Sequence, residues 1–256
     1  MIWQAEAIWE AVVPLLPGFT VEVLPQVDST NSELMRRVRA GQTDPVLLVA
    51  EHQTAGRGRL GRAWESEPLS ALTFSLGMPL SPPDWSGLSL AVGLSVVESL
   101  HPGLRLKWPN DVWLEGRKMG GILIETASSG AVRFAVIGVG INITARDPEG
   151  LRTPPAALKE VMPGLDAPKA LAAIVPDLVR CIQRFEAQGF GPLQAAFQAR
   201  DFLWGCAVEC SDGAIGVARG VDETGALLVH TAAGLKKITS AEVSVRPTPP
   251  RVENAH

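Results

Sequence analysis

Cysteine is scarce in this sequence, whose 256 residues include only Cys181, Cys206 and Cys210. An odd number of cysteines without regular spacing argues against a disulfide framework and fits a reducing compartment. Cys206 and Cys210 are four residues apart, but no second cysteine pair or histidine pair has the spacing of zinc ligands. We therefore interpret the two as small apolar side chains on one face of a strand.

Long apolar runs and an excess of basic residues are also missing. No apolar stretch reaches the roughly 20 residues of a membrane-spanning helix, and the N-terminal MIWQAEAIWEAVV lacks the basic region of a signal peptide. The formal net charge is −4, so the composition gives no basis for binding nucleic acid or a membrane. Apolar residues make up 46% and charged residues 20%, the balance of a globular protein. We predict a soluble, cytoplasmic protein.

The periodicity of the apolar residues predicts a large α+β domain. Helical spacing or N-cap residues mark 2–13, 32–40, 86–100, 156–161, 168–188 and 190–200. Strand patterns mark 20–27, 45–53, 69–78, 105–114, 120–128 and 131–143, with a Pro-Asn-Asp turn that divides 105–114 into two strands. Because the strands are joined both as hairpins and through helices, we expect a mixed β-sheet flanked by helices.

The character of the sequence changes after Trp204. Five short strands follow, separated by Asp-Gly, Glu-Thr-Gly and Ala-Gly turns. This pattern predicts a small SH3-like β-barrel. We therefore divide the chain into a domain of residues 1–201 and a domain of residues 202–256.

Residues 55–62 concentrate three glycines and three arginines in one loop. Glycines allow the backbone to approach a ligand closely, and arginines donate forked, charged hydrogen bonds to carboxylates and phosphates. In an acidic protein this loop is expected to bind an anion such as ATP, although a solvated basic turn would look the same. The loop lacks the Gly-Lys-Ser/Thr of a Walker A motif and is not a dinucleotide-binding fingerprint.

Three further segments have both a structural and a functional interpretation. Residues 28–31, Asp-Ser-Thr-Asn, supply N-cap chemistry, but their hydroxyl and amide groups also suit a small polar head group. Lys118 precedes two glycines and a buried strand, so it is either a surface lysine or a cation at a strand entry. Gly138 and Gly140 alternate in an apolar strand, which leaves one face open to a flat ligand or to close helix packing.

In this order, the segments resemble the biotin protein ligases. The resemblance rests on Asp-Ser-Thr-Asn (28–31), Gln-Thr-Ala-Gly-Arg-Gly-Arg-Leu-Gly-Arg (53–62) with Trp64, Lys-Trp-Pro-Asn-Asp (107–111), Lys-Met-Gly-Gly-Ile-Leu (118–123) and Gly-Val-Gly-Ile-Asn (138–142). The C-terminal stretch also resembles the small β domain of that family, so the resemblance covers residues 20–246. It implies a catalytic domain with a mixed sheet, related to lipoate ligases, followed by an SH3-like domain.

The resemblance also implies roles for the matched residues. Arg57, Arg59 and Lys118 are expected to be catalytic, because they would hold the biotin carboxylate and the ATP phosphates. The residues expected around biotin are Ser29, Thr30, Asn31, Gln53, Gly56, Arg57, Gly58, Arg59, Lys118, Gly138 and Gly140. The residues expected around ATP are Arg57, Arg59, Arg62, Trp64, Asn110, Asp111, Lys118 and Asn142, and Asp111 is also expected to help place magnesium.

The implied activity consists of two steps. Biotin reacts with ATP and Mg²⁺ to give biotinyl-5′-AMP, and biotin then passes to a lysine of the biotin carboxyl carrier protein of acetyl-CoA carboxylase. Some members carry an N-terminal helix-turn-helix domain that represses genes, but too few residues precede Asp28 for such a module, so we expect no DNA partner. Many members dimerise through strand edges. The sequence identifies no such edge, which leaves a homodimer open.

Two other functions compete with biotin ligation. A lipoate-protein ligase would perform the same chemistry on another acid, but the arginine loop and Lys-Trp-Pro-Asn-Asp favour biotin. A non-catalytic module that senses biotin or a nucleotide would not need Lys118 together with all three loop arginines.

Overall fold

The computed structural model describes residues 2–65, 67–147, 153–239 and 244–247. Its larger part contains, in chain order, α1 (Ala5–Val12), β1 (Thr20–Leu24), α2 (Thr30–Arg39), β2 (Val46–Ala50), η1 (Arg59–Gly61), β3 (Ala71–Pro79), α3 (Leu88–Leu100), β4 (Arg105–Lys107), β5 (Asp111–Leu114), β6 (Arg117–Ser129), β7 (Val132–Asn142), η2 (Leu158–Glu160), α4 (Ala167–Gln188), η3 (Gly191–Leu193) and α5 (Gln194–Arg200). The smaller part contains β8 (Ala207–Cys210), β9 (Ile215–Val221), β10 (Leu227–Thr231), β11 (Gly234–Ile238) and β12 (Val245–Pro247). No helix within the described ranges has the length and apolar character needed to span a bilayer.

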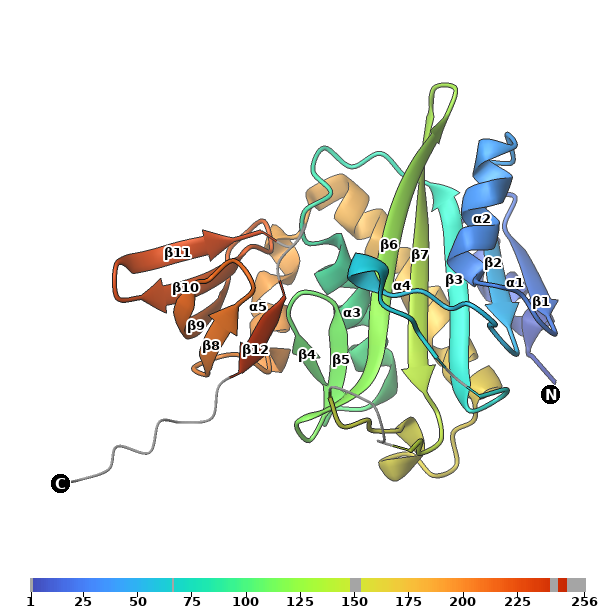
Figure 1. The fold of residues 1–256 in the computed structure, drawn as a ribbon. Helices are drawn as coiled ribbons and strands as arrows, with labels where there is room; N and C mark the ends of the chain where they lie inside the picture. Colours follow the sequence, from blue (N-terminus) through green and yellow to red (C-terminus); the bar gives the residue numbers. More distant parts are fainter. Residues whose placement is uncertain (1, 66, 148–152, 240–243, 248–256) are drawn as a thin grey trace.

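The strands form two sheets that lie beside each other (Figure 1). The large sheet has the order β1-β2-β3-β7-β6-β5-β4, and the small sheet has the order β11-β10-β9-β8-β12. β1 and β2 are parallel, whereas the other neighbouring pairs of the large sheet are antiparallel. The mixed sheet and the small antiparallel SH3-like unit confirm the predicted fold class. The segment predicted as a helix at 156–161 is a short 3₁₀ turn, η2.

Helices cover the large sheet on both faces, but unequally. α1, α3 and α4 pack behind it, and α2 covers only part of the other face, over β2, β3, β6 and β7 (Figure 1). The side chains of β7 alternate between the two faces. Ala135, Ile137, Val139 and Ile141 belong to the core behind the sheet, whereas Phe134 and Val136 pack under α2. After Phe134 and Val136, the same face of β7 continues with Gly138 and Gly140, which have no side chains, and ends at Asn142.

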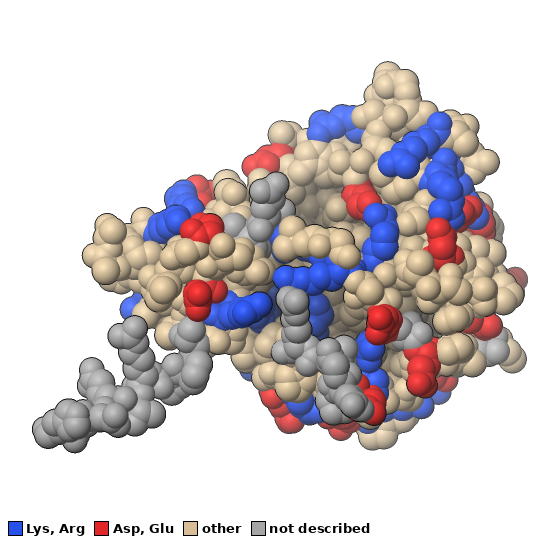
Figure 2. Space-filling model, in the orientation of Figure 1, with Lys and Arg blue, Asp and Glu red and all other residues tan. Residues whose placement is uncertain are grey.

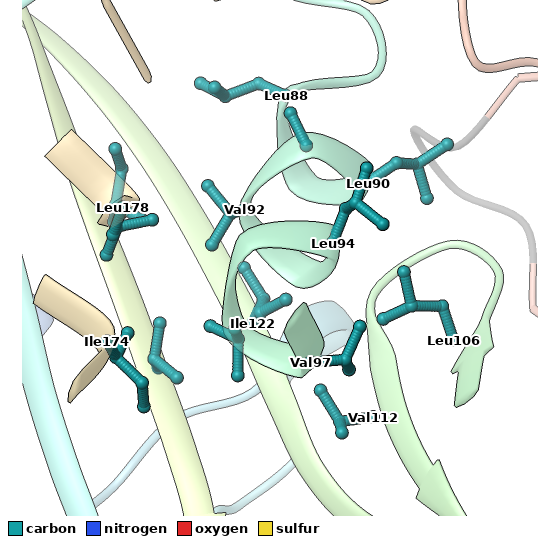
Figure 3. Packing of buried hydrophobic residues seen from close by; sticks show 14 of the residues in the cluster. Leu88, Leu90, Val92, Leu94, Val97, Leu106, Val112, Ile122, Ile174 and Leu178 are labelled. Carbon is teal, nitrogen blue, oxygen red and sulfur yellow. The ribbon is translucent and has the colours of Figure 1, made fainter. Parts of the chain in front are cut away.

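The core behind the sheet is centred on α3. This helix is buried on nearly every side, which explains why 86–100 is apolar throughout. Figure 3 shows its Val92, Leu94 and Val97 between α4, which contributes Ile174 and Leu178, and the strands. A close-packed core of this kind resists movement, so it holds β5 and β6 rigidly from behind.

The two sheets are joined through the β4–β5 hairpin. Trp108 in its turn is fully buried, and its indole Nε1 donates a 3.0 Å hydrogen bond to the carbonyl of Gly225 in the small unit. Phe202, at the start of that unit, donates its backbone N–H to Leu106 (2.8 Å) and packs its ring 4.5 Å from that of Trp113. The small unit therefore fixes the position of the hairpin that carries Asn110 and Asp111.

Asp201 lies at this junction, and only one of the two oxygens of its buried carboxyl group accepts a hydrogen bond from the described part of the chain. Its Oδ1 accepts a 2.9 Å hydrogen bond from the Leu203 N–H, but its Oδ2 has no hydrogen-bond partner among the described residues. Burial disfavours the charged form and raises the pKa of Asp201 from 3.8 to about 6.

This carboxyl predicts a pH-dependent stability. The pKa of Asp201 is higher in the folded protein than in the unfolded chain, so the protonated carboxyl stabilises the fold relative to the charged one. This stabilisation is fully present below about pH 4 and is lost as the pH rises through about 6. We expect the free energy of unfolding of the wild type to fall across that window by up to ~3 kcal/mol relative to Asp201→Asn. Urea unfolding of both proteins between pH 4.5 and 7 measures the difference. Parallel curves would contradict the prediction.

Candidate active site

The part of the large sheet around Gly138 and Gly140 is the floor of a cavity of about 760 Å³. Its walls come from the N-terminus of α2, the 55–64 loop, the β4–β5 hairpin and, from the small unit, Phe202 and residues 244–247. Figure 2 shows lysine and arginine side chains gathered around a hollow between the two units. Segments that are far apart in the sequence thus enclose one space large enough for a small-molecule ligand.

Glycines shape the floor of the cavity. A Cβ on Gly138 would lie 2.1 Å from Oδ1 of Asn31, and a Cβ on Gly140 would lie 2.6 Å from the indole of Trp64. The alternation of these glycines in β7 therefore has a specific cause, because each admits one polar or aromatic side chain onto the sheet. On the neighbouring strand, Ser75 and Thr73 stand opposite Gly138 and Gly140 and face the same side.

A network of neutral hydrogen bonds lines one end of the cavity. Gln53 Oε1 accepts from the backbone N–H (2.8 Å) and the hydroxyl (3.0 Å) of Thr30. The Ser75 hydroxyl lies 2.7 Å from Thr30 Oγ1 and donates to Asn31 Oδ1 at 2.6 Å. Ser29 is the N-cap of α2, so its hydroxyl accepts from the Ser32 N–H (3.4 Å). These groups suit an uncharged polar head group better than a phosphate, because they carry no net charge.

The arginine loop is a small folded unit. Gly58 N–H donates to Arg62 (2.7 Å) and Trp64 N–H donates to Gly56 (2.9 Å), which closes a miniature hairpin. The reversal at its tip uses Leu60 and Gly61, both with positive φ (57° and 69°). Such backbone geometry is rare for leucine and common for glycine. The loop is therefore held in shape by its own hydrogen bonds.

Three side chains attach the loop to the rest of the domain. Arg57 Nη2 lies 2.5 Å from Glu125 Oε2, and Arg59 Nη1 donates to Asn110 Oδ1 at 3.3 Å. The Trp64 indole rests on Gly140, and its buried Nε1 has no hydrogen-bond partner among the described residues. Since a buried indole N–H usually finds an acceptor, Trp64 presents an available donor at the cavity wall.

Cations collect at the other end of the cavity. Lys118 Nζ lies 2.6 Å from Asp111 Oδ1, and the Lys107 ammonium lies 5.4 Å from the ring centroid of Trp113. Burial, which penalises the charged form, is the main reason why the pKa of Lys107 and the pKa of Arg59 are lowered, while the charge of Asp111 acts in the opposite direction. One carboxylate among several cations gives a region that favours a polyanion.

The structure brings together nearly all of the predicted site residues. The cavity is lined by Ser29, Thr30, Asn31, Gln53, Arg57, Gly58, Arg59, Arg62, Trp64, Asn110, Asp111, Lys118, Gly138 and Gly140. Gly56 lies behind the lining, and a Cβ there would lie 2.3 Å from the Trp64 carbonyl oxygen and 3.0 Å from Gln53 Nε2. It therefore packs beside Gln53, as expected.

Asn142 was expected at the nucleotide but lies outside the cavity lining. It is buried, and its Nδ2 donates a 3.1 Å hydrogen bond to the Ala156 carbonyl. The amide thus fastens the segment after β7 to the end of the sheet. The structure gives Asn142 a role in the fold, and its predicted contact with ATP has no geometric support.

Several lining residues escaped the sequence prediction. They are Thr73, Lys107, Trp113, Phe202 and residues 244–247, and Ser75 and Glu125 join the network behind the lining. Lys107 begins the Lys-Trp-Pro-Asn-Asp string and could have been singled out as the cation of that motif. Thr73 and Ser75 had a weaker signal, the alternation of polar and apolar residues in 71–77. Nothing in the sequence near 244–247 indicated a contact with a site more than a hundred residues earlier.

Comparisons with known proteins find relatives of both parts of the chain. The Biotin/lipoate A/B protein ligase family matches residues 23–142, and the Biotin protein ligase C terminal domain matches residues 206–246. The chain is 34% identical over 243 residues to the bifunctional ligase/repressor BirA of Escherichia coli (strain K12), covering 90% of this chain and 75% of that protein. It is likewise 34% identical over 242 residues to the biotin–[acetyl-CoA-carboxylase] ligase of Mycobacterium tuberculosis, covering 87% and 88% of the two chains.

A solved structure extends the likeness to the whole fold. The biotin protein ligase from Aquifex aeolicus in complex with biotin and ATP has a TM-score of 0.78 and 30% identity, over 89% of this chain and 99% of that chain. The likeness includes both the large sheet and the small unit beside it. Since both family models match and the 34% identical relatives are covered over most of their own length, the chain belongs to the biotin protein ligase family.

Proposed function

We propose that this chain joins biotin to ATP and then transfers biotin to a lysine of the biotin carboxyl carrier protein of acetyl-CoA carboxylase. One observation carries the proposal: a single cavity has a neutral hydrogen-bonding network at one end and a group of cations at the other. The first end suits the ureido ring of biotin, and the second suits a carboxylate beside a triphosphate. We further propose that residues 1–201 form the catalytic domain and residues 202–256 the SH3-like domain.

In the first step, the biotin carboxylate attacks the α-phosphorus of ATP. An oxygen–phosphorus bond forms, the bond to the pyrophosphate breaks, and biotinyl-5′-AMP results. Both reactants are anions, so the protein must offset their repulsion and align them. We assign this task to Arg59, Lys118 and Lys107, with Arg62 at the phosphates. The catalytic contact expected of Arg57, which pairs with Glu125 in this structure, stays a prediction.

Magnesium fits the residues at this end of the cavity. Mg²⁺ is typically bound by one or two carboxylates together with substrate phosphates, and Asp111 provides one carboxylate beside the Asn110 amide. Among the described residues, no group of three or more His, Cys, Asp or Glu forms a complete metal cage. The ion would therefore arrive with the nucleotide, as MgATP, and would offset phosphate charge.

In the second step, a carrier lysine attacks the acyl carbon of the mixed anhydride and AMP leaves. The amine must be neutral to react, and we assign acceptance of its proton to Asp111. Asp111 Oδ1 lies 2.6 Å from Lys118 Nζ, so this carboxylate stands at the end of the cavity where we place the mixed anhydride. The homodimer, the cytoplasmic location and the absence of a DNA partner stay predictions.

Ligation of lipoate is the nearest competing function. Thr30, Gln53 and Ser75 favour biotin, because the ureido ring has two N–H donors and a carbonyl to pair with them, whereas the dithiolane ring of lipoate has none. A site built for hydrogen bonds disfavours an analogue that lacks them. The non-catalytic sensing module is disfavoured by the cations at Arg59, Lys107 and Lys118.

The experiment that tests the proposal measures pyrophosphate release by the purified protein with MgATP and biotin, lipoate or neither acid. We expect release with biotin alone, followed by labelling of a biotin carboxyl carrier domain. Release with lipoate instead of biotin would mean that lipoate is the substrate, with the same two-step mechanism. A folded protein that releases no pyrophosphate with either acid would overturn the proposal.

A further inference from the structure

Glu125 on β6 stands between the arginine loop and the neutral end of the cavity. A single carboxylate oxygen, Oε2, lies 2.5 Å from Arg57 Nη2 and 3.0 Å from Asn31 Nδ2. One partner belongs to the loop, and the other sits at the N-terminal end of α2. We propose that Glu125 is a positioning residue that couples the arginine loop to the pocket for the acid's head group. This inference rests on the proposed function.

From Glu125 the contacts continue inward without a gap. Asn31 spans the space above Gly138, where no Cβ interferes, and its Oδ1 accepts from Ser75 at 2.6 Å. Ser75 lies 2.7 Å from the Thr30 hydroxyl, and Thr30 donates to Gln53. The Glu125 carboxylate shares Asn31 Nδ2 with the Leu123 carbonyl, which accepts at 3.1 Å. Together they orient the Asn31 amide with its Nδ2 toward β6 and its Oδ1 toward the head-group pocket.

In the outward direction Glu125 holds the loop. The loop is internally hydrogen bonded, so a displaced Arg57 would take Arg59 and Trp64 along with it. On its outer side the loop borders a second cavity, of about 480 Å³, whose lining includes Arg57, Glu125 and Leu60. The loop thus has open space on that side, and the Arg57–Glu125 pair bridges the cavity wall. The pair also offsets the charge of Arg57, as Asp111 offsets that of Lys118, which leaves the excess positive charge of the cavity with Arg59, Arg62 and Lys107.

The Arg57–Glu125 ion pair affects the position of the loop more than the stability of the fold. The Arg57 side chain is 43% exposed and the Glu125 side chain 24% exposed, and ion pairs of this exposure add little to global stability. The position of the loop decides where Arg59 stands relative to the substrate. A change at Glu125 should therefore affect acid binding before it affects the melting temperature.

Glu125→Gln tests the inference. Glutamine keeps the size and an acceptor for Asn31, but it loses the charge that holds Arg57. In pyrophosphate release, we expect the KM for biotin to rise about tenfold, the range of one charge-assisted hydrogen bond, with kcat changed less than about threefold. The Arg57→Gln, Glu125→Gln double variant should have the same KM for biotin as Arg57→Gln alone, because the contact between Glu125 and the loop is already absent in that variant.

A second readout does not depend on catalysis. Trypsin cleaves after arginine, and Arg57, Arg59 and Arg62 all lie in the loop, so the cleavage rate there reports on loop position in the ligand-free protein. We expect cleavage within 57–62, identified by mass spectrometry, to be about tenfold faster in Glu125→Gln than in the wild type. Asp177→Asn is the matched control, because it removes a carboxylate paired with Arg180 at 2.7 Å on the distant helix α4.

The two readouts separate the possible failures. Unchanged loop cleavage and an unchanged KM for biotin in a folded Glu125→Gln variant would overturn the inference. A wild type without biotin-dependent release would overturn the proposed function, while the trypsin rates would still decide the role of Glu125. If Glu125→Gln lowers the melting temperature more than Asp177→Asn does, Arg57→Gln tests the same contact from the loop side.

Discussion

Replacement of Lys118 by alanine is expected to lower biotin-dependent pyrophosphate release by about 10²–10³-fold, the usual cost of removing one donor from developing negative charge. Lys118 stands at the entry to β6, with its ammonium 2.6 Å from Asp111 at the cationic end of the cavity. Arg59 and Lys107 remain in the variant. We therefore expect substrates still to bind, so that kcat falls much more than the KM for biotin rises.

The fold should tolerate this change. Lys118 holds the strand entry through its backbone, whose N–H donates to the Pro154 carbonyl at 3.0 Å, and alanine keeps that bond. The matched control is Lys169→Ala, which removes an exposed lysine beside Asp166 on α4. Circular dichroism and the melting temperature check folding, and a coupled pyrophosphate assay gives the rate. A variant that unfolds, or one that forms adenylate at the wild-type rate, would refute the role assigned to Lys118.

Local patterns in the sequence predicted most of the fold, because they depend on neighbouring residues. The apolar residues of 86–100 recur at helical spacing and predict a helix, and the helix α3 confirms this prediction. Ser29 at the N-cap and the glycine turns after Trp204 likewise act within a few residues. Prediction from local patterns fails at η2, which was expected to be an α-helix and is a 3₁₀ turn of three residues. So short a segment does not show enough periodicity to distinguish a helix from a turn.

The assembly of the site could be predicted only through the family resemblance. Gly138 shows the reason: its spacing suggested an open strand face, but only the structure shows that Asn31, from more than a hundred residues earlier, fills it. Glu125 had no signal at all, because a glutamate near the middle of a strand is equally compatible with solvent. Asn142 was carried over together with its motif. Its amide donates to the Ala156 carbonyl and it lies outside the cavity lining, so its contact with ATP stays a prediction.

The Lys-Trp-Pro-Asn-Asp string combines both kinds of role within five residues. Lys107, Asn110 and Asp111 face the cavity, whereas the Trp108 indole is buried and bound to Gly225. The motif is therefore partly a site and partly an attachment for the small unit. A sequence motif alone cannot separate the two, because burial depends on contacts with distant segments.

Replacing either glycine of β7 by alanine is the second change for which we expect a large effect on activity. The two positions should affect the KM of different substrates. We expect Gly138→Ala to raise the KM for biotin by about 10–100-fold, since overpacking of this kind costs about 1–3 kcal/mol. The added methyl group would lie 2.1 Å from Asn31 Oδ1, so Asn31 must leave its place between Ser75 and Glu125. Gly140→Ala should instead raise the KM for ATP, because its methyl group displaces the Trp64 indole.

The opposite pattern in the two KM values would contradict the division of the cavity into an acid end and a nucleotide end. Gly164→Ala is the control, because a Cβ there meets no atom within 4 Å. Steady-state pyrophosphate release with each substrate varied in turn gives both constants for all three variants. Equal losses for both substrates at Gly138 and Gly140 would mean that a methyl group on β7 disturbs the whole sheet face. Separate losses would mean that two adjacent outward positions of one strand each hold a different wall side chain in place, Asn31 for the acid and Trp64 for the nucleotide.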